Sequence, residues 1–171
     1  MNRNWNKDWR KSIIIMSGGF DPIHKGHLRM FREASWLGHH VVIGLNSDDW
    51  LTRKKGKPFM DFEERKEIIE GFKYVNQVIP FDDSDDTASD LIRRVHSIYD
   101  GEEFEHNYKD DDHMGMVDYY QIYFANGGDR GKGNVPELDV CKELGVTMLW
   151  GVGGGKIQSS SWLINGGKDE V

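Results

Sequence analysis

The alternation of short apolar runs with segments of helical period is the feature that most constrains how this chain folds. Five runs rich in β-branched residues are spaced along the sequence, at 13–17, 40–45, 75–81, 122–125 and 146–150. Between the runs, apolar residues recur every three or four positions, which is the period of a helix with one buried face. Strands alternating with helices predict an α/β fold: a single Rossmann-like domain with a central parallel sheet of about five strands flanked by helices.

The helices and turns are predicted from their end residues and apolar spacing. Helices are expected at 25–37, from Asp61 through Phe72, from Thr87 through Ile98, at 136–144 and at 160–164. Asp61 and Thr87 are residue types that cap helix N-termini. Residues 46–49 are expected to close the second strand as a turn, with a basic loop following at 53–57. Pro80 predicts that the third strand lies at an edge, because proline cannot donate to a sheet ladder.

Length, charge and cysteine content narrow the class of protein. We expect one domain over 1–171, with an N-terminal extension at 1–11 and an acidic insertion at 100–120. The insertion is interpreted as a surface excursion, with a divalent-metal site as the alternative. The net charge of −7 argues against a nucleic-acid-binding surface. Cys141 is the only cysteine, and no apolar stretch approaches the ~20 residues that span a bilayer. These features predict a cytoplasmic protein without nucleic-acid or membrane partners.

Four polar or glycine-rich segments directly follow predicted strands. They are residues 18–27, 46–57, 126–130 and 151–161. The carboxyl ends of parallel strands meet at one edge of the sheet, where such folds bind their ligands. The four segments are therefore expected to converge on one site.

Two histidines, His24 and His27, flank Gly26 where the first strand is expected to pass into a helix. A helix N-terminus presents unpaired N–H groups and partial positive charge, and glycine lets a phosphate approach the backbone. Imidazoles add donors that can stabilise charge on a leaving phosphate. The segment predicts a triphosphate site at which the α-phosphorus is attacked; the alternative is a structural turn.

The chain resembles the cytidylyltransferase-like nucleotidyltransferases over roughly 12–164. The first family signature is similar to Gly19-Phe20-Asp21-x-x-His24-x-Gly26-His27, and the second to Ser159-Ser160-Ser161. The resemblance implies catalytic roles for His24, His27, Lys54 and Lys57. It implies nucleotide binding by Gly18, Gly19, Phe20, Asp21, Gly26, Ser159, Ser160 and Ser161, and substrate binding by Arg65, Asp129 and Arg130. The alternatives are a flexible linker for the serines, an ordinary helix ion pair with Asp61 for Arg65, and a glycine-rich turn for Arg130.

Within this family the chain resembles the branch of heptose-1-phosphate adenylyltransferase and glycerol-3-phosphate cytidylyltransferase. Gly127-Gly128-Asp129 favours the heptose enzymes, whereas Gly154 stands where the glycerol-phosphate enzymes place an arginine. The resemblance implies transfer of AMP from ATP to a sugar phosphate such as a heptose 1-phosphate, with pyrophosphate released. It also implies Mg²⁺ carried by the nucleoside triphosphate without dedicated protein ligands, and a homodimer. The alternatives are a CTP-dependent enzyme acting on glycerol 3-phosphate or another polyol or sugar phosphate, and a non-catalytic nucleotide-binding regulatory module.

Overall fold

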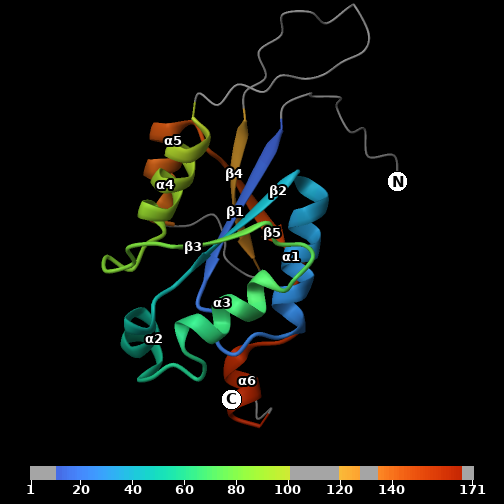
Figure 1. The fold of residues 1–171 in the computed structure, drawn as a ribbon, viewed down its shortest axis with the longest axis vertical. Coiled ribbons are helices and arrows are strands. Elements are labelled where there is room, and N and C mark those ends of the chain that lie inside the picture. Colours follow the sequence, from blue (N-terminus) through green and yellow to red (C-terminus); the bar gives the residue numbers. More distant parts are fainter. Residues whose placement is uncertain (1–10, 101–119, 128–134, 167–171) are drawn as a thin grey trace, which may run out of the picture.

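The protein is built around one parallel sheet (Figure 1). The computed structural model describes residues 11–100, 120–127 and 135–166. The sheet has the order β3-β2-β1-β4-β5 and every pairing in it is parallel. Its strands are β1 (Ser12–Gly18), β2 (His40–Leu45), β3 (Gln77–Pro80), β4 (Gln121–Gly127) and β5 (Thr147–Val152). The predicted α/β fold is confirmed, and β3 with its Pro80 lies at an edge as predicted.

Helices cover both faces of the sheet. They are α1 (Lys25–Leu37), α2 (Asp48–Lys55), α3 (Phe62–Glu70), α4 (Ser89–Tyr99), α5 (Glu137–Leu144) and α6 (Ser160–Ile164). Alternate residues of β1 divide the core: Ile13 and Ile15 pack with α4 and α5, whereas Ile14 and Met16 pack with α1 and α3. Both faces of β1 are therefore buried, which explains why its sequence is apolar throughout.

Two local predictions are wrong. Residues 48–55, expected as a turn and a basic loop, form α2, because the Ser47 side chain accepts a hydrogen bond from the Trp50 N–H and caps the helix. Helix α4 begins at Ser89 with Ala88 rather than Thr87 as the N-cap, and the Thr87 Oγ1 accepts a hydrogen bond from the Ser89 N–H at 3.2 Å. The Ala88 N–H donates to the Glu137 carboxylate of α5, at 2.9 Å. A side chain 49 residues away thus adds to the hydrogen bond that Thr87 makes at the start of α4.

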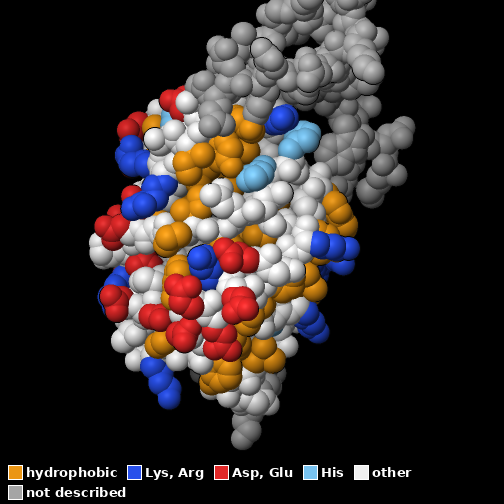
Figure 2. Space-filling model, viewed as in Figure 1, with side chains coloured by type: hydrophobic (Ala, Val, Ile, Leu, Met, Phe, Trp, Pro, Cys, Tyr) orange, Lys and Arg blue, Asp and Glu red, His pale blue; other side chains and the backbone are white. Residues whose placement is uncertain are grey.

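The outer surface of α3 is acidic, as the red side chains in front of the sheet show (Figure 2). Glu63, Glu64, Glu67 and Glu70 are all exposed there. The negative charge of this face disfavours the binding of an anionic ligand there. Among the described residues, no helix is both long enough and apolar enough to cross a bilayer.

Candidate active site

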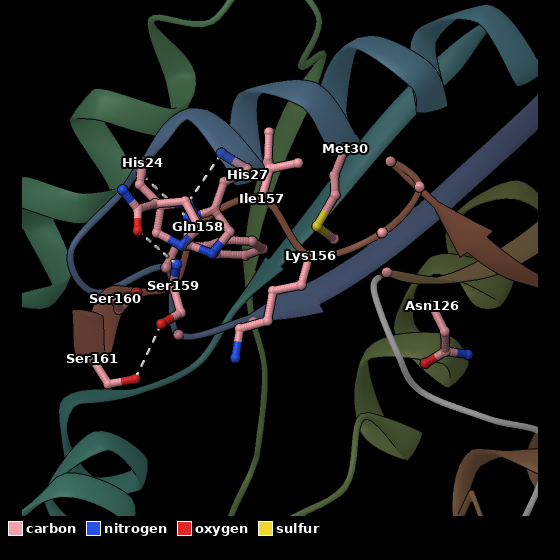
Figure 3. A pocket seen from close by; sticks show the side chains of 18 of the residues that line it. His24, His27, Met30, Asn126, Lys156, Ile157, Gln158, Ser159, Ser160 and Ser161 are labelled. Atoms are coloured by element: carbon pink, nitrogen blue, oxygen red, sulfur yellow. Dashed lines mark hydrogen bonds between the residues drawn. The ribbon is translucent and has the colours of Figure 1, made fainter. Parts of the chain in front are cut away.

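A pocket of about 380 Å³ lies where β1, β4 and β5 end, next to the start of α1 (Figure 3). Three of the four predicted segments form most of its wall, and the fourth contributes Lys55. The lining residues are Ser17–Phe20, His24, Gly26, His27, Met30, Lys55, Ala125–Gly127 and Gly153–Ser161. The predicted convergence at the carboxyl edge of the sheet is confirmed for the described parts of these segments.

Two imidazoles form the N-terminal cap of α1. His24 is the N-cap, and its Nδ1 accepts a hydrogen bond from the Gly26 N–H at 3.0 Å. The His27 Nδ1 accepts in return from the His24 N–H at 3.4 Å. A Cβ on Gly26 would lie 2.8 Å from the His24 ring, so glycine makes room for that imidazole. The histidines thus do the work that Ser/Thr and Glu/Gln do in an ordinary capping box.

These hydrogen bonds determine where the imidazoles carry their protons. Each Nδ1 accepts from a backbone N–H, so in the neutral rings Nε2 bears the hydrogen and remains a donor. The rings stack with centroids 3.7 Å apart. Burial, His24 and Lys55 lower the pKa of His27 to about 3. Burial first and Lys55 second also lower the pKa of His24. At neutral pH His27 is therefore an uncharged Nε2–H donor.

Phe20 lines the pocket and packs against His27. Its ring meets the His27 ring edge-on at 4.9 Å and the Phe31 ring at 5.3 Å. Phe20 is 5% exposed and has a φ of +48°, a backbone conformation uncommon for a bulky residue. Such strain is typical of functional sites, where surrounding packing enforces it. The contact holds the His27 ring against the sheet.

The serine run forms the part of the pocket wall next to the histidines. The Ser159 Oγ caps α6 by accepting from the Trp162 N–H, and it also lies 3.2 Å from the Ser161 Oγ. The Ser160 Oγ donates to the Pro22 carbonyl at 2.9 Å, so α6 is tied to the turn before α1. This hydrogen bond joins residues that are 138 positions apart in the sequence, and it places the serines beside the histidines. The interpretation as a flexible linker is wrong, because Ser160 and Ser161 begin a helix.

The basic residue at the pocket is not the one predicted. Lys54 points away, and its Nζ pairs with an Asp86 carboxylate oxygen at 3.2 Å. Lys57 is exposed beyond the end of α2 and is not among the lining residues. Lys55 lines the pocket instead, with its Nζ donating to the Asp21 carbonyl at 2.8 Å. Successive residues of a helix point about 100° apart. A prediction of helix over 48–55 would therefore have placed the Lys54 and Lys55 side chains on different faces.

Arg65 and Asp21 are structural rather than exposed to the pocket. The Arg65 guanidinium is fully buried and donates to the Met60, Gly19 and Asn46 carbonyls and to Asp48. Arg65 is not among the residues that line the pocket, and its ion pair is with Asp48 rather than with Asp61, as the alternative had it. The buried Asp21 carboxylate accepts from the N–H groups of residues 59 and 60, both at 2.7 Å. Neither side chain has a free edge for nucleotide.

Of the remaining predicted residues, Gly18, Gly19 and Gly26 line the pocket as expected, whereas Asp129 and Arg130 lie outside the described residues. Lys156 and Asn126 also line the pocket, although neither is among the predicted site residues. Lys156 lies on the pocket wall, with its Nζ 5.0 Å from the Trp162 ring centroid. Both residues fall in segments that the sequence predicts to converge on the site, 151–161 for Lys156 and 126–130 for Asn126. In the part of the chain that the structure describes, no three His, Cys, Asp or Glu side chains are grouped to hold a metal ion.

Comparison with known proteins agrees with this arrangement. Residues 15–130 match the family model described as cytidylyltransferase-like. The chain is 33% identical over 79 residues to glycerol-3-phosphate cytidylyltransferase of Bacillus subtilis, covering 46% of this chain and 61% of that protein. It is 32% identical over 87 residues to the bifunctional protein HldE of Coxiella burnetii, covering 50% of this chain and 18% of that protein. The chain therefore spans about three fifths of the first relative and under a fifth of the second.

Solved structures share the fold at low sequence identity. A lipopolysaccharide core biosynthesis protein from Thermoplasma volcanium superposes with a TM-score of 0.54 at 22% identity, covering 82% of this chain and 93% of that one. A bifunctional NMN adenylyltransferase/ADP ribose pyrophosphatase from Francisella tularensis superposes with a TM-score of 0.57 at 16% identity, covering 91% and 42%. At these identities the likeness shows a common sheet architecture.

Proposed function

Because this chain belongs to the cytidylyltransferase-like family, we propose that it transfers a nucleoside monophosphate from a nucleoside triphosphate to a phosphorylated small molecule. The observation that carries the proposal is the stacked pair of imidazoles at the start of α1. Both rings present Nε2–H donors, and they share one pocket with the Ser159–Ser161 wall. Donors grouped in this way suit a triphosphate whose charge shifts during reaction.

The acceptor phosphate attacks the α-phosphorus as the bond from that phosphorus to the bridging oxygen breaks. The new bond is a phosphate anhydride, and the electron pair leaves with pyrophosphate. The attacking phosphate is already an anion, so a strong general base is not required. His24 and His27 donate to oxygens that gain charge, while Lys55 and Lys156 offset the charge of the triphosphate. Ser161 and the neighbouring backbone bind the leaving pyrophosphate.

Magnesium is proposed to enter with the nucleotide. The described pocket lining includes no carboxylate, the ligand that Mg²⁺ prefers from proteins. The residues present therefore do not form a Mg²⁺ site of their own, and Mg²⁺ bound to phosphate oxygens of the nucleotide is the arrangement compatible with them. The protein's own part in catalysis is to position the substrates and donate hydrogen bonds.

For the two substrates, ATP and a sugar 1-phosphate such as a heptose 1-phosphate are the first choice, on the sequence resemblance given above. CTP with glycerol 3-phosphate is the second candidate. It is favoured by the relatives from Bacillus subtilis and Staphylococcus aureus, both named glycerol-3-phosphate cytidylyltransferase. The described pocket lining is compatible with either base, since its polar side chains at the sheet end can both donate and accept.

Pyrophosphate release tests the proposal directly. The purified protein is incubated with Mg²⁺ and ATP, CTP, GTP or UTP, each with heptose 1-phosphate, glycerol 3-phosphate or other sugar phosphates. Thermal shift with each nucleotide runs in parallel, because a ligand at 100 times its Kd stabilises by about 2.7 kcal/mol. Release with ATP and a sugar 1-phosphate is the expected result. Binding of nucleotide without release from any pair would support the regulatory module instead.

A further inference from the structure

Asn126 has a buried hydrogen-bond donor that the protein leaves unpaired. The residue lies on β4 at the carboxyl edge of the sheet, is 3% exposed, and lines the pocket. Its Nδ2 is buried and has no hydrogen-bond partner among the described residues. Buried amide groups in native proteins are nearly always hydrogen-bonded. An unpaired one has lost its hydrogen bonds to water and gains none from the protein, which destabilises the folded state. An unpaired amide at a pocket wall indicates that an atom of the ligand accepts its hydrogen bond.

A second asparagine shows what the paired case looks like in this fold. Asn46 directly follows β2, on the other side of β1, and is 6% exposed. Its Nδ2 donates to the Asp83 carboxylate at 3.0 Å, and its backbone carbonyl accepts from Arg65. Both amides are equally buried at the same edge of the sheet. Of these two asparagines, Asn126 is the one that lines the pocket and the one whose Nδ2 has no hydrogen-bond partner.

The backbone around Asn126 departs from regular pairing. The register between β4 and β5 shifts between Ala125 and Gly127, so one extra residue of β5 opposes this position. Irregularities of this kind occur beside active sites, where they redirect a side chain. In Figure 3, Asn126 lies across the pocket from Ser159 and Ser161. The amide is therefore separated from the wall that would hold the leaving pyrophosphate.

We propose that Asn126 is a specificity-determining residue whose Nδ2–H donates to an uncharged oxygen or nitrogen of the bound substrate, on its nucleoside or on its sugar or polyol. The inference rests on the proposed function. Phosphate groups are served by the histidines, lysines and serines, whereas a neutral amide suits a hydroxyl, carbonyl or ring nitrogen. A site that leaves such a donor unpaired discriminates against analogues that lack the acceptor atom.

Asn126→Leu removes the donor and keeps the branched shape of the side chain. In the ligand-free protein, the melting temperature is expected to stay the same or rise, because an unpaired buried donor is removed. Asn46→Leu is the matched control, and it is expected to lower the melting temperature because the Asp83 carboxylate loses a partner. Asn46→Ser repeats the control with a smaller change. A merely structural Asn126 would behave as Asn46 does.

Substrate binding is then measured with ATP and with CTP, each with Mg²⁺, by titration calorimetry. The KM of the acceptor is measured for the pair that releases pyrophosphate. Asn126→Leu and Asn126→Ala are both expected to weaken one of these by about tenfold, equivalent to about 1.4 kcal/mol. Two variants of different size separate loss of the donor from steric obstruction. Weakened nucleotide binding assigns the partner to the nucleoside, and a raised acceptor KM alone assigns it to the sugar or polyol.

Wild-type binding and KM values in both Asn126 variants would overturn this proposal while leaving the proposed function intact. A fall in melting temperature with unchanged binding would also overturn it, since Asn126 would then be structural. If the wild-type protein binds neither ATP nor CTP, the proposed function fails first, and the role of Asn126 falls with it.

Discussion

Two groups of polar side chains lie at the same edge of the sheet and use their hydrogen bonds in opposite ways. Beside β2 is a closed cluster made of Asn46, Ser47, Asp48, Arg65 and Asp83. Its donors and acceptors are joined to one another or to nearby carbonyls, with the Arg65 guanidinium wholly buried. Where β1, β4 and β5 end, the pocket instead presents donors without protein partners among the described residues.

This difference in hydrogen bonding distinguishes the closed cluster, which supports the fold, from the pocket, which is the candidate active site. Both groups contain the charged and polar types that bind phosphate, and both follow strands in the sequence. The closed cluster stabilises the turn at Gly19 and the end of β2, because Arg65 donates to both backbone carbonyls. The pocket keeps the imidazole Nε2–H groups and the Asn126 amide available. Unpaired donors, rather than residue types, therefore distinguish the pocket from the closed cluster.

The largest expected effect is on the pocket side. His27→Ala removes a donor from the pocket in which we propose that the triphosphate binds, and we expect turnover to fall by about 10²–10³, as for loss of an oxyanion donor. Circular dichroism should show the fold retained, because the Phe20 and Phe31 packing beneath the ring remains. The measurement is the rate of pyrophosphate release at saturating substrate. Near-normal turnover in the folded variant would contradict the role given to His27.

The closed cluster should respond in stability rather than in rate. Arg65→Met leaves buried carbonyls and the Asp48 carboxylate without their donor. Breaking a buried charged network costs about 3–5 kcal/mol, and the lower end applies because Asp48 is 39% exposed. Urea unfolding measures the loss, and substrate KM values of the folded protein should not change. A raised KM at unchanged stability would instead return Arg65 to the substrate.

The pH dependence of stability provides a test of the buried imidazole. Burial lowers the pKa of His27 from 6.5 to about 3, so between these values the unfolded chain binds a proton that the folded protein does not. Stability from this group is fully present above pH 6.5 and is lost as the pH falls toward 3. The expected loss is about 2 kcal/mol between pH 7 and 5.

His27→Gln is the matched variant for this experiment, since glutamine at the third helical position fits an ordinary capping box. Urea unfolding of both proteins at pH 7 and pH 5 gives the comparison. The variant should lose about 2 kcal/mol less than the wild type over this interval. An equal loss in both proteins would show that other groups carry the pH dependence.

The sheet and most helices could be predicted because their signals are local and redundant. Ile13–Met16 is buried on both faces, which leaves an unbroken apolar run in the sequence. Helix α2 was missed because Leu51 is its only buried residue, so it lacks an apolar stripe. Its signal was instead the Ser47-Asp48-Asp49 cap, which was read as a turn. Polar caps and turns share the same residue types, and local sequence does not distinguish them here.

For the site, the histidines, glycines and serines were found because their spacing is unusual. Lys55, Lys156 and Asn126 were not, and Arg65 was assigned to substrate. What separates these residues is their place in the fold: Arg65 is fully buried away from the pocket, whereas Lys55, Lys156 and Asn126 line it. That property depends on contacts such as Arg65 to Gly19, 46 positions apart, which residue spacing does not contain.

The smallest expected effect is the difference between two adjacent lysines, Lys55 at the pocket and Lys54 on the outer surface. Lys55 lines the pocket, and its Nζ donates one hydrogen bond to the Asp21 carbonyl. Because that acceptor is uncharged, the positive charge of Lys55 remains available to a phosphate. Lys54 pairs with Asp86 on the surface. Lys55→Met is expected to raise the KM for the nucleotide by about tenfold, as expected for one charge-assisted hydrogen bond. Lys54→Met carries the same change in net charge and should leave that KM unchanged, so equal effects would mean that only the overall charge matters. A larger effect at Lys54 would place the nucleotide over the outer side of α2 and join the two regions into one site.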